Sequence, residues 1–191
     1  MTTDSTRREY VSRAGLKLAH ALGEFRVTVS ALVCADLGSN AGGFVDCLLQ
    51  AGAARVYAIE RGYGIVDYRI RTDPRVVVME RTDALHARLP EPVDLVTIDA
   101  GWTRQARILP AAVRLLKPGG AVISLVKPHY EAAPEMLDRG VLMAEHLPIV
   151  LDAVRRDVAD CGLMILGEAV SPILGHGGNR EILWHLRGAL S

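Results

Sequence analysis

The sequence is poor in cysteine. Only three are present among 191 residues, Cys34, Cys47 and Cys161, and their number is odd and their spacing is not C-x-x-C. This pattern argues against a disulfide framework and against a cysteine zinc site, so we expect three buried thiols. The six histidines show no metal-binding spacing either, and no metal is expected.

Long hydrophobic runs are also missing. No apolar run reaches the ~18 residues that a membrane span needs, although half of the residues are hydrophobic. The first nine residues are polar and lack the apolar core of a signal peptide. We therefore expect a cytoplasmic protein that makes no contact with a membrane, and we exclude a membrane pore.

The chain also lacks a net charge, because its 22 Lys and Arg residues balance its 22 Asp and Glu residues. A protein that holds nucleic acid by itself usually has a strong positive excess. Any affinity for RNA must then come from a local patch or be weak. The N-terminal cations Arg7, Arg8, Arg13, Lys17 and Arg26 form one candidate patch, and a solvated polar arm is the alternative interpretation.

Apolar runs that alternate with helical patterns fill the rest of the chain. The predicted strands are 32–37, 55–59, 76–79, 93–98, 121–126, 163–170 and 181–186. Helices are expected from Ser12, as N-cap, and over 43–51, 65–70 and 105–116, with a polar and helical stretch from 131 to 161. This alternation predicts a doubly wound α/β fold, whose seven-stranded, mostly parallel sheet has helices on both faces. The last two strands are joined by a short Gly-rich loop and should form an antiparallel hairpin. We expect one domain, 11–191, after a flexible lead, 1–10.

The first strand of this sheet runs into a Gly-rich turn, Asp36 to Phe44, which precedes a helix. Glycines permit tight reversals and close backbone approach, and the following helix presents unpaired N–H groups. The turn is neither G-x-G-x-x-G nor a phosphate loop. An acid at the strand end suits a cationic or neutral ligand, and S-adenosylmethionine is such a ligand. A simple tight turn is the alternative.

Ligands of open α/β sheets lie beyond the carboxyl ends of the strands. The residues found there include Glu60, Asp83, Asp99 and Lys127. Glu60 is placed to accept hydrogen bonds from a ribose diol, and Asp83 from an adenine amino group. Asp99 and Lys127 should meet at the edge of the pocket, either as a surface ion pair or as catalytic groups.

Several ordered motifs resemble the TlyA-like branch of the FtsJ-like methyltransferases, from Tyr10 to Arg187. The motifs are Tyr10-Val11-Ser12-Arg13-Ala14-Gly15-Leu16-Lys17-Leu18, the Asp36 turn through Gln50, Gly62-Tyr63-Gly64, Asp73-Pro74-Arg75-Val76, Leu116-Lys117-Pro118-Gly119-Gly120, Leu125-Val126-Lys127-Pro128 and Ser171-Pro172-Ile173. The resemblance implies a Rossmann-like class I methyltransferase fold. It also implies transfer of a methyl group from S-adenosylmethionine to a ribose 2′-hydroxyl of ribosomal RNA.

The same resemblance implies a Lys-Asp-Lys-Glu tetrad, here Lys17, Asp99, Lys127 and Glu181. A ribose hydroxyl is a weak nucleophile, so a neutral amine beside it must take its proton, and a second cation nearby favours that neutral form. The remaining work is alignment for in-line transfer. The cofactor-binding residues expected are Asp36, Gly38, Ser39, Asn40, Gly42, Gly43, Phe44, Glu60, Asp83 and Asp99. The substrate-binding residues expected are Arg13, Trp102, His129 and Arg180.

The chain departs from the family pattern in ways that bear on the substrate. TlyA-like proteins usually carry an S4-type RNA-binding domain, and few residues precede the first motif here. Something else, such as a delivering partner, must then bring the RNA, or the substrate is different. A homo-oligomer is also left open. The family's Ser-Arg-Gly-Gly is Ser-Arg-Ala-Gly here, a change that should leave Lys17 in place. The chain has Ala100-Gly101-Trp102 where the family has Val-Ser-Phe, and Asn179-Arg180-Glu181-Ile182 where it has Asn-Ile-Glu-Phe.

Several alternatives stay open at this point. Trp102 would stack on a substrate base or pack on a helix, Arg180 would touch a phosphate or stay solvated, and His129 would line the pocket or only pack. A methyltransferase for a small-molecule or natural-product hydroxyl remains an alternative function. So does a cofactor-binding partner protein without turnover. Whether 131–146 forms a lid is also open.

Overall fold

The computed structural model describes residues 9–188, so the predicted patch residues Arg7 and Arg8 lie outside the described part. A seven-stranded sheet has the order β3-β2-β1-β4-β5-β9-β8. Its strands are β1 (Val33–Leu37), β2 (Arg55–Ile59), β3 (Val76–Met79), β4 (Val93–Ile98), β5 (Leu116–Val126), β8 (Leu163–Val170) and β9 (Ile182–Gly188). Strands β1 to β5 pair in parallel, whereas β9 is antiparallel to both β5 and β8. The doubly wound sheet and its C-terminal hairpin are confirmed.

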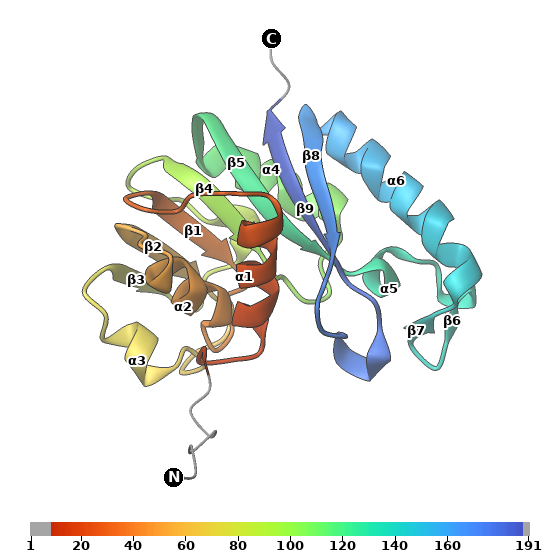
Figure 1. The fold of residues 1–191 in the computed structure, drawn as a ribbon, viewed down its shortest axis with the longest axis horizontal. Helices are drawn as coiled ribbons and strands as arrows, with labels where there is room; N and C mark the ends of the chain where they lie inside the picture. The colour runs from red at the N-terminus through yellow and green to blue at the C-terminus, as the bar shows by residue number, and fades with distance from the viewer. Residues whose placement is uncertain (1–8, 189–191) are drawn as a thin grey trace.

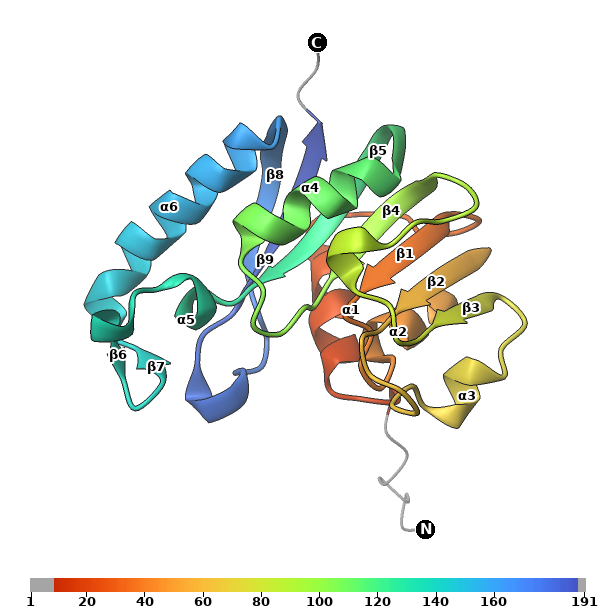
Figure 2. The ribbon, with the colours of Figure 1, turned by 180° about the vertical axis from the view of Figure 1, so that it is seen from behind.

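Helices cover both faces of the sheet (Figures 1 and 2). Helices α1 (Ala14–Glu24) and α2 (Gly43–Gln50) lie on one face, and α4 (Gln105–Leu115) and α6 (Leu147–Asp160) lie on the other. The apolar strands therefore contribute to two cores, one around Phe44 and Leu48 and the other around Leu109 and Trp184. The short helices α3 (Tyr68–Arg71) and α5 (Pro128–Glu131) follow β2 and β5.

The order of strands reverses between β1 and β4, and this reversal places the site. Chain connections leave β1 toward β2 on one side and enter β4 on the other, which opens a crevice at their carboxyl ends. Asp36 is in register with Thr97, so the turn after β1 lies directly beside Asp99. Two segments about sixty residues apart in the sequence are thereby neighbours.

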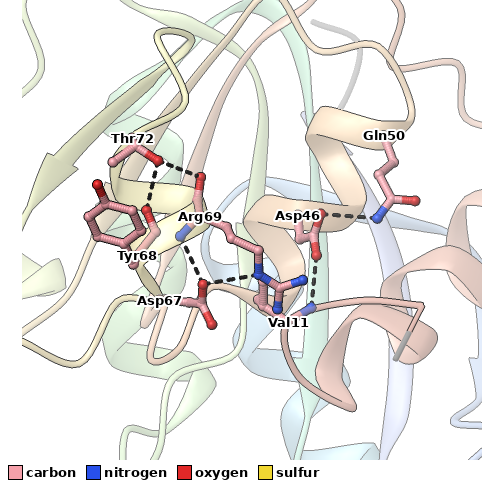
Figure 3. Close-up of polar contacts among 7 residues, drawn as sticks. All are labelled: Val11, Asp46, Gln50, Asp67, Tyr68, Arg69 and Thr72. Carbon is pink, nitrogen blue, oxygen red and sulfur yellow. Dashed lines mark hydrogen bonds and ion pairs between the residues drawn. The ribbon is translucent and has the colours of Figure 1, made fainter. Parts of the chain in front are cut away.

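The start of the described chain is docked on α2 (Figure 3). The backbone N–H of Val11 donates to Asp46 at 2.8 Å, and the Gln50 amide donates to Asp46 and to the carbonyl of Glu9, both at 3.0 Å. Beside it, Asp67 caps α3 by accepting from the backbone of Arg69. The last two residues of the predicted flexible lead are therefore held in place, Glu9 by the hydrogen bond from Gln50 and Tyr10 by packing against the core around Phe44.

Some predicted local features are wrong. Helix α1 begins at Ala14, and its N-cap position is Arg13, with no side-chain capping bond, because Ser12 instead packs over Gly43. The stretch from 131 to 161 contains a two-stranded hairpin, β6 (Leu137–Asp138) and β7 (Val141–Leu142), as well as α6. Cys34 and Cys47 are buried as predicted, but Cys161 is only half-buried.

Candidate active site

A cavity of about 890 Å³ opens at the carboxyl edge of the sheet. Side chains from both sides of the reversal point line it. They include the predicted residues Lys17, Gly38, Asn40, Glu60, Asp83, Asp99, Trp102, Lys127, His129 and Glu181. A smaller hollow of about 90 Å³ continues from it and is lined by Asp36, Gly38, Ser39, Asn40, Phe44 and Asp99, among others. The structure therefore brings most of the predicted site together.

The cofactor side of this cavity is built from backbone held by Glu60. One carboxylate oxygen of Glu60 accepts from the N–H of Asn40 at 2.8 Å, and the other accepts from the N–H of Gly62 at 2.7 Å. The loops after β1 and β2 are thus tied to one acid. Asp83 accepts from the backbone N–H of Leu85 at 2.9 Å and caps the 3-10 helix η1 (Ala84–His86). Both acids keep oxygen lone pairs available toward the cavity.

Asp36 is fully buried at the end of β1. One of its oxygens accepts from the hydroxyl of Thr97 at 2.7 Å, and the other, Oδ2, has no hydrogen-bond partner. Burial raises the pKa of Asp36 to about 7, and the hydrogen bond from Thr97 and the nearby hydroxyl of Ser39 only partly oppose this rise. An orphaned carboxylate oxygen beside a hollow is suited to a ligand that brings its own positive charge.

The glycines of the turn have different roles. Gly38 has a φ of +86°, and a Cβ there would lie 2.9 Å from the backbone of Asp99 and Ala100, so glycine lets the two neighbouring loops touch. Gly42 and Gly43 face the side chains of Ile70 and Ser12, and neither lines the two cavities. These two glycines hold the turn against its surroundings.

The acceptor side is made of two lysine–carboxylate pairs. Lys127, which directly follows β5, lies 2.5 Å from Asp99, which directly follows β4. Lys17 on α1 is paired with Glu181, the residue before β9. The Lys17 and Glu181 side chains are 11% and 4% exposed, and those of Lys127 and Asp99 are 14% and 18% exposed. Two amines and two acids from four elements meet at one cavity wall.

The loop before β9 fixes Glu181. Gly175 packs so closely that a Cβ there would lie 2.2 Å from a carboxylate oxygen of Glu181. The buried side chain of Asn179 donates to the carbonyls of Gly140 and His176, and accepts from the backbone N–H of Leu142. Asn179 thereby joins this loop to the β6–β7 hairpin.

Aromatic side chains continue the wall beyond Lys127. Trp102 is 86% exposed and stacks on Tyr130 of the short helix α5, at 4.7 Å between ring centroids. Its role in stacking on a substrate base stays a prediction. Tyr130 lies beneath Lys127, with the amine 5.8 Å from the ring centroid. His129 is buried, and burial together with Lys127 lowers its pKa to about 4, so its imidazole is neutral near pH 7.

Sequence reasoning missed several residues that contact or line the site, and four expected residues line neither cavity: Arg13, Arg180, Gly42 and Gly43. Thr97, Tyr130 and His176 contact or line the site. The aromatic that follows Lys127-Pro128-His129 was a usable signal for Tyr130, whereas nothing local indicated His176. Arg13 and Arg180 are exposed and line neither cavity. Their roles as substrate contacts stay predictions.

Two features are absent from residues 9–188. No cluster of three or more metal-ligating side chains is present in this part of the chain. None of the helices described has the length and apolar character required to cross a membrane.

The fold and the site together define a class. A sheet of this order with one antiparallel strand next to the last, and an acid-ended Gly turn at its reversal point, is the arrangement of Rossmann-like methyltransferases. The family model for FtsJ-like methyltransferases matches residues 10–183. The chain belongs to the FtsJ-like methyltransferase family, and the resemblance seen in its motifs is confirmed.

Individual relatives agree with this assignment. The 16S/23S rRNA (cytidine-2′-O)-methyltransferase TlyA of Mycobacterium tuberculosis is 37% identical over 195 residues, which are 98% of this chain and 71% of TlyA. The 23S rRNA (cytidine-2′-O)-methyltransferase TlyA of Campylobacter jejuni is 30% identical over 92% of this chain and 70% of its own length. A solved structure from Streptococcus thermophilus superposes with a TM-score of 0.93 at 35% identity, and covers 98% of this chain and 70% of that one.

Proposed function

We propose that the protein transfers a methyl group from S-adenosylmethionine to a ribose 2′-hydroxyl of RNA, with ribosomal RNA as the substrate. The single observation that carries the reaction type is the meeting of Lys127–Asp99 and Lys17–Glu181 beside the cofactor turn. The relatives named as rRNA (cytidine-2′-O)-methyltransferases support the choice of RNA.

The residues of the cofactor side fit S-adenosylmethionine. The unpartnered Oδ2 of Asp36 would accept from the ammonium group of the cofactor, which the burial of this carboxylate makes strongly favourable. Glu60 would accept from the ribose diol, and Asp83 from the adenine amino group. Ser39, Asn40 and Phe44 would surround the methionine end in the smaller hollow. When bound, the cofactor supplies a methyl group activated by its sulfonium.

The residues of the acceptor side would handle the hydroxyl and its proton. Lys127 would take the proton from the 2′-hydroxyl in its neutral form, after its ammonium group has released a proton to solvent. Asp99 lines both cavities and would orient the amine. Lys17 would favour the neutral form of Lys127, and Glu181 would hold Lys17 in place through the buried pair. The geometry would then serve mainly to align the acceptor oxygen.

The test is methyl transfer from labelled S-adenosylmethionine to free ribosomal RNA, isolated ribosomal subunits and intact ribosomes. We expect label in a ribose of at least one of these, and none with the Lys127→Ala variant. Label that persists in the variant would contradict the assigned base. If wild type binds the cofactor but labels none of them, the alternative of a small-molecule hydroxyl gains support.

A further inference from the structure

The segment after Asp99 concentrates positive charge in a protein whose net charge is zero. From Ala100 to Tyr130 the sequence has no Asp or Glu, yet it contains Arg104, Arg107, Arg114, Lys117 and Lys127. Arg107 lines the large cavity together with Trp102 and Thr103, and Arg104 comes next along the chain. We call Trp102, Arg104 and Arg107 the α4 strip. It lies at the mouth of the site, next to the acceptor side.

The two arginines of the strip are placed unfavourably for the helix itself. Arg104 is the N-cap of α4 and Arg107 lies in its first turn, where the helix dipole disfavours cations. The nearby acid, Glu131, accepts from the backbone N–H of Gln105 at 2.8 Å and is not ion-paired with either arginine. Within residues 9–188, neither arginine has a carboxylate at ion-pair distance. Their placement is explained if they meet an anion outside the chain.

Trp102 combines an unusual backbone conformation with an exposed side chain. Its φ of +58° lies in the left-handed region, which a bulky side chain rarely adopts, and such strain is concentrated at functional sites. Its indole leaves most of its surface in solvent while it stacks on Tyr130. An exposed aromatic platform beside cations is the arrangement that binds unpaired nucleotides, because bases stack on it while arginines meet phosphates.

We propose that the α4 strip binds the RNA strand that flanks the target nucleotide, an inference that rests on the proposed function. The strip selects an unpaired segment of that strand. A base stacks on Trp102, and phosphates contact Arg104 and Arg107. A duplex binds more weakly, since its stacked bases present no free face to the indole.

The experiment compares charge reversal at the strip with the same reversal elsewhere. The strip variant is Arg104→Glu with Arg107→Glu. The control variant is Arg156→Glu with Arg187→Glu, because both arginines are exposed, line no part of the large cavity and have no ion pair within residues 9–188. Binding is measured by fluorescence anisotropy with a short labelled RNA strand of mixed sequence and with the same strand annealed to its complement.

We expect wild type and the control to prefer the single strand, with a steep salt dependence. The strip variant should lose affinity more than tenfold, and its slope of log affinity against log salt should fall by about 1.4, since two phosphate contacts are lost. Trp102→Ala should weaken single-strand binding by about fivefold to a hundredfold and abolish the preference over duplex. The midpoint of urea unfolding should stay close to that of wild type in all variants, which shows that they are folded.

The outcomes separate this inference from the proposed function. If wild type methylates ribosomal RNA but the strip and control variants bind the single strand equally, the strip is not the RNA surface. A duplex bound as tightly as the single strand would contradict the selection of an unpaired segment. If wild type neither binds nor methylates RNA while the cofactor still binds, the proposed function itself fails.

Discussion

The two sides of the cavity are built on different principles. On the cofactor side, Glu60 accepts from the backbones of Asn40 and Gly62, and Gly38 allows the backbone of Asp99 to approach. On the acceptor side, four charged side chains form two ion pairs, Lys17 with Glu181 and Lys127 with Asp99. Backbone fixed by hydrogen bonds forms a rigid shape, whereas paired side chains can exchange partners when a hydroxyl arrives. We therefore expect that substitutions in this protein can lower cofactor affinity and the rate of methyl transfer independently.

The strongest test of this separation compares one substitution on the acceptor side with one on the cofactor side, and measures both cofactor affinity and the rate of methyl transfer. Lys127→Ala should lower the rate of methyl transfer by about 10²–10⁴-fold, the usual contribution of a general base, while the cofactor Kd changes only a few-fold. Glu60→Gln should do the reverse, with a Kd about tenfold weaker because a charge-assisted hydrogen bond is lost, and a nearly normal rate at saturating cofactor. Calorimetric binding and single-turnover methylation measure the two quantities.

The interpretation is wrong if both variants lose affinity and rate to the same extent. That result would mean that the two sides form one cooperative unit. Lys127→Arg serves as a matched control, because it keeps the charge near Asp99 but cannot act as a neutral base.

The buried pair of the acceptor side should be as important for folding as for chemistry. Lys17→Met leaves Glu181 as an uncompensated charge that is almost fully buried, so we expect the free energy of unfolding to fall by about 3–5 kcal/mol. Lys17→Met with Glu181→Leu should recover most of this loss without recovering activity. Urea unfolding of the three proteins measures the differences.

The control makes the same substitution in an exposed pair. Lys117 pairs with Asp94 at 2.8 Å, with side chains 39% and 28% exposed. Lys117→Met should therefore cost less than about 1 kcal/mol. Equal losses for Lys17→Met and Lys117→Met would show that burial of the Lys17 pair has no energetic consequence.

The sequence predicted best what depends on strand ends. Asp36 and Asp99 follow apolar runs, and parallel strands bring their carboxyl ends to one edge, so their proximity needs no knowledge of side-chain contacts. The sequence also predicted the order of helices and strands, because buried parallel strands are continuous apolar runs.

What could not be predicted depends on contacts between distant segments. The β6–β7 hairpin has two-residue strands, and its backbone is held by Asn179, which lies beyond the whole of α6 and β8. The packing of Gly43 against Ser12 displaces the expected N-cap, although Ser12 is a good capping residue by type. The exposure of Trp102 likewise depends on a left-handed backbone that no local pattern indicates.

A pH-dependent effect is expected from Asp36, whose buried Oδ2 has no hydrogen-bond partner. Burial raises the pKa of Asp36 to about 7 in the free protein, so the group is protonated below that pH. A bound ammonium would favour the carboxylate, so binding would release a proton, and affinity should fall as the pH drops through about 7. Between about pH 7.5 and 5.5 we expect the Kd for S-adenosylmethionine to rise about 25-fold. Above about pH 8 the cofactor's own amino group deprotonates, so measurements stay below it.

The Asp36→Asn variant shows whether the pH dependence of the Kd comes from Asp36 or from another group in the site. The amide keeps the shape of the side chain and cannot ionise, so the variant should bind more weakly at pH 7.5 and show a nearly flat Kd over the same range. The raised pKa also predicts that the free wild-type protein loses stability as the pH rises from about 4 to 7, and that the variant does not. A wild-type Kd that does not change with pH would place the ammonium of the cofactor away from Asp36, and the smaller hollow would then need another occupant.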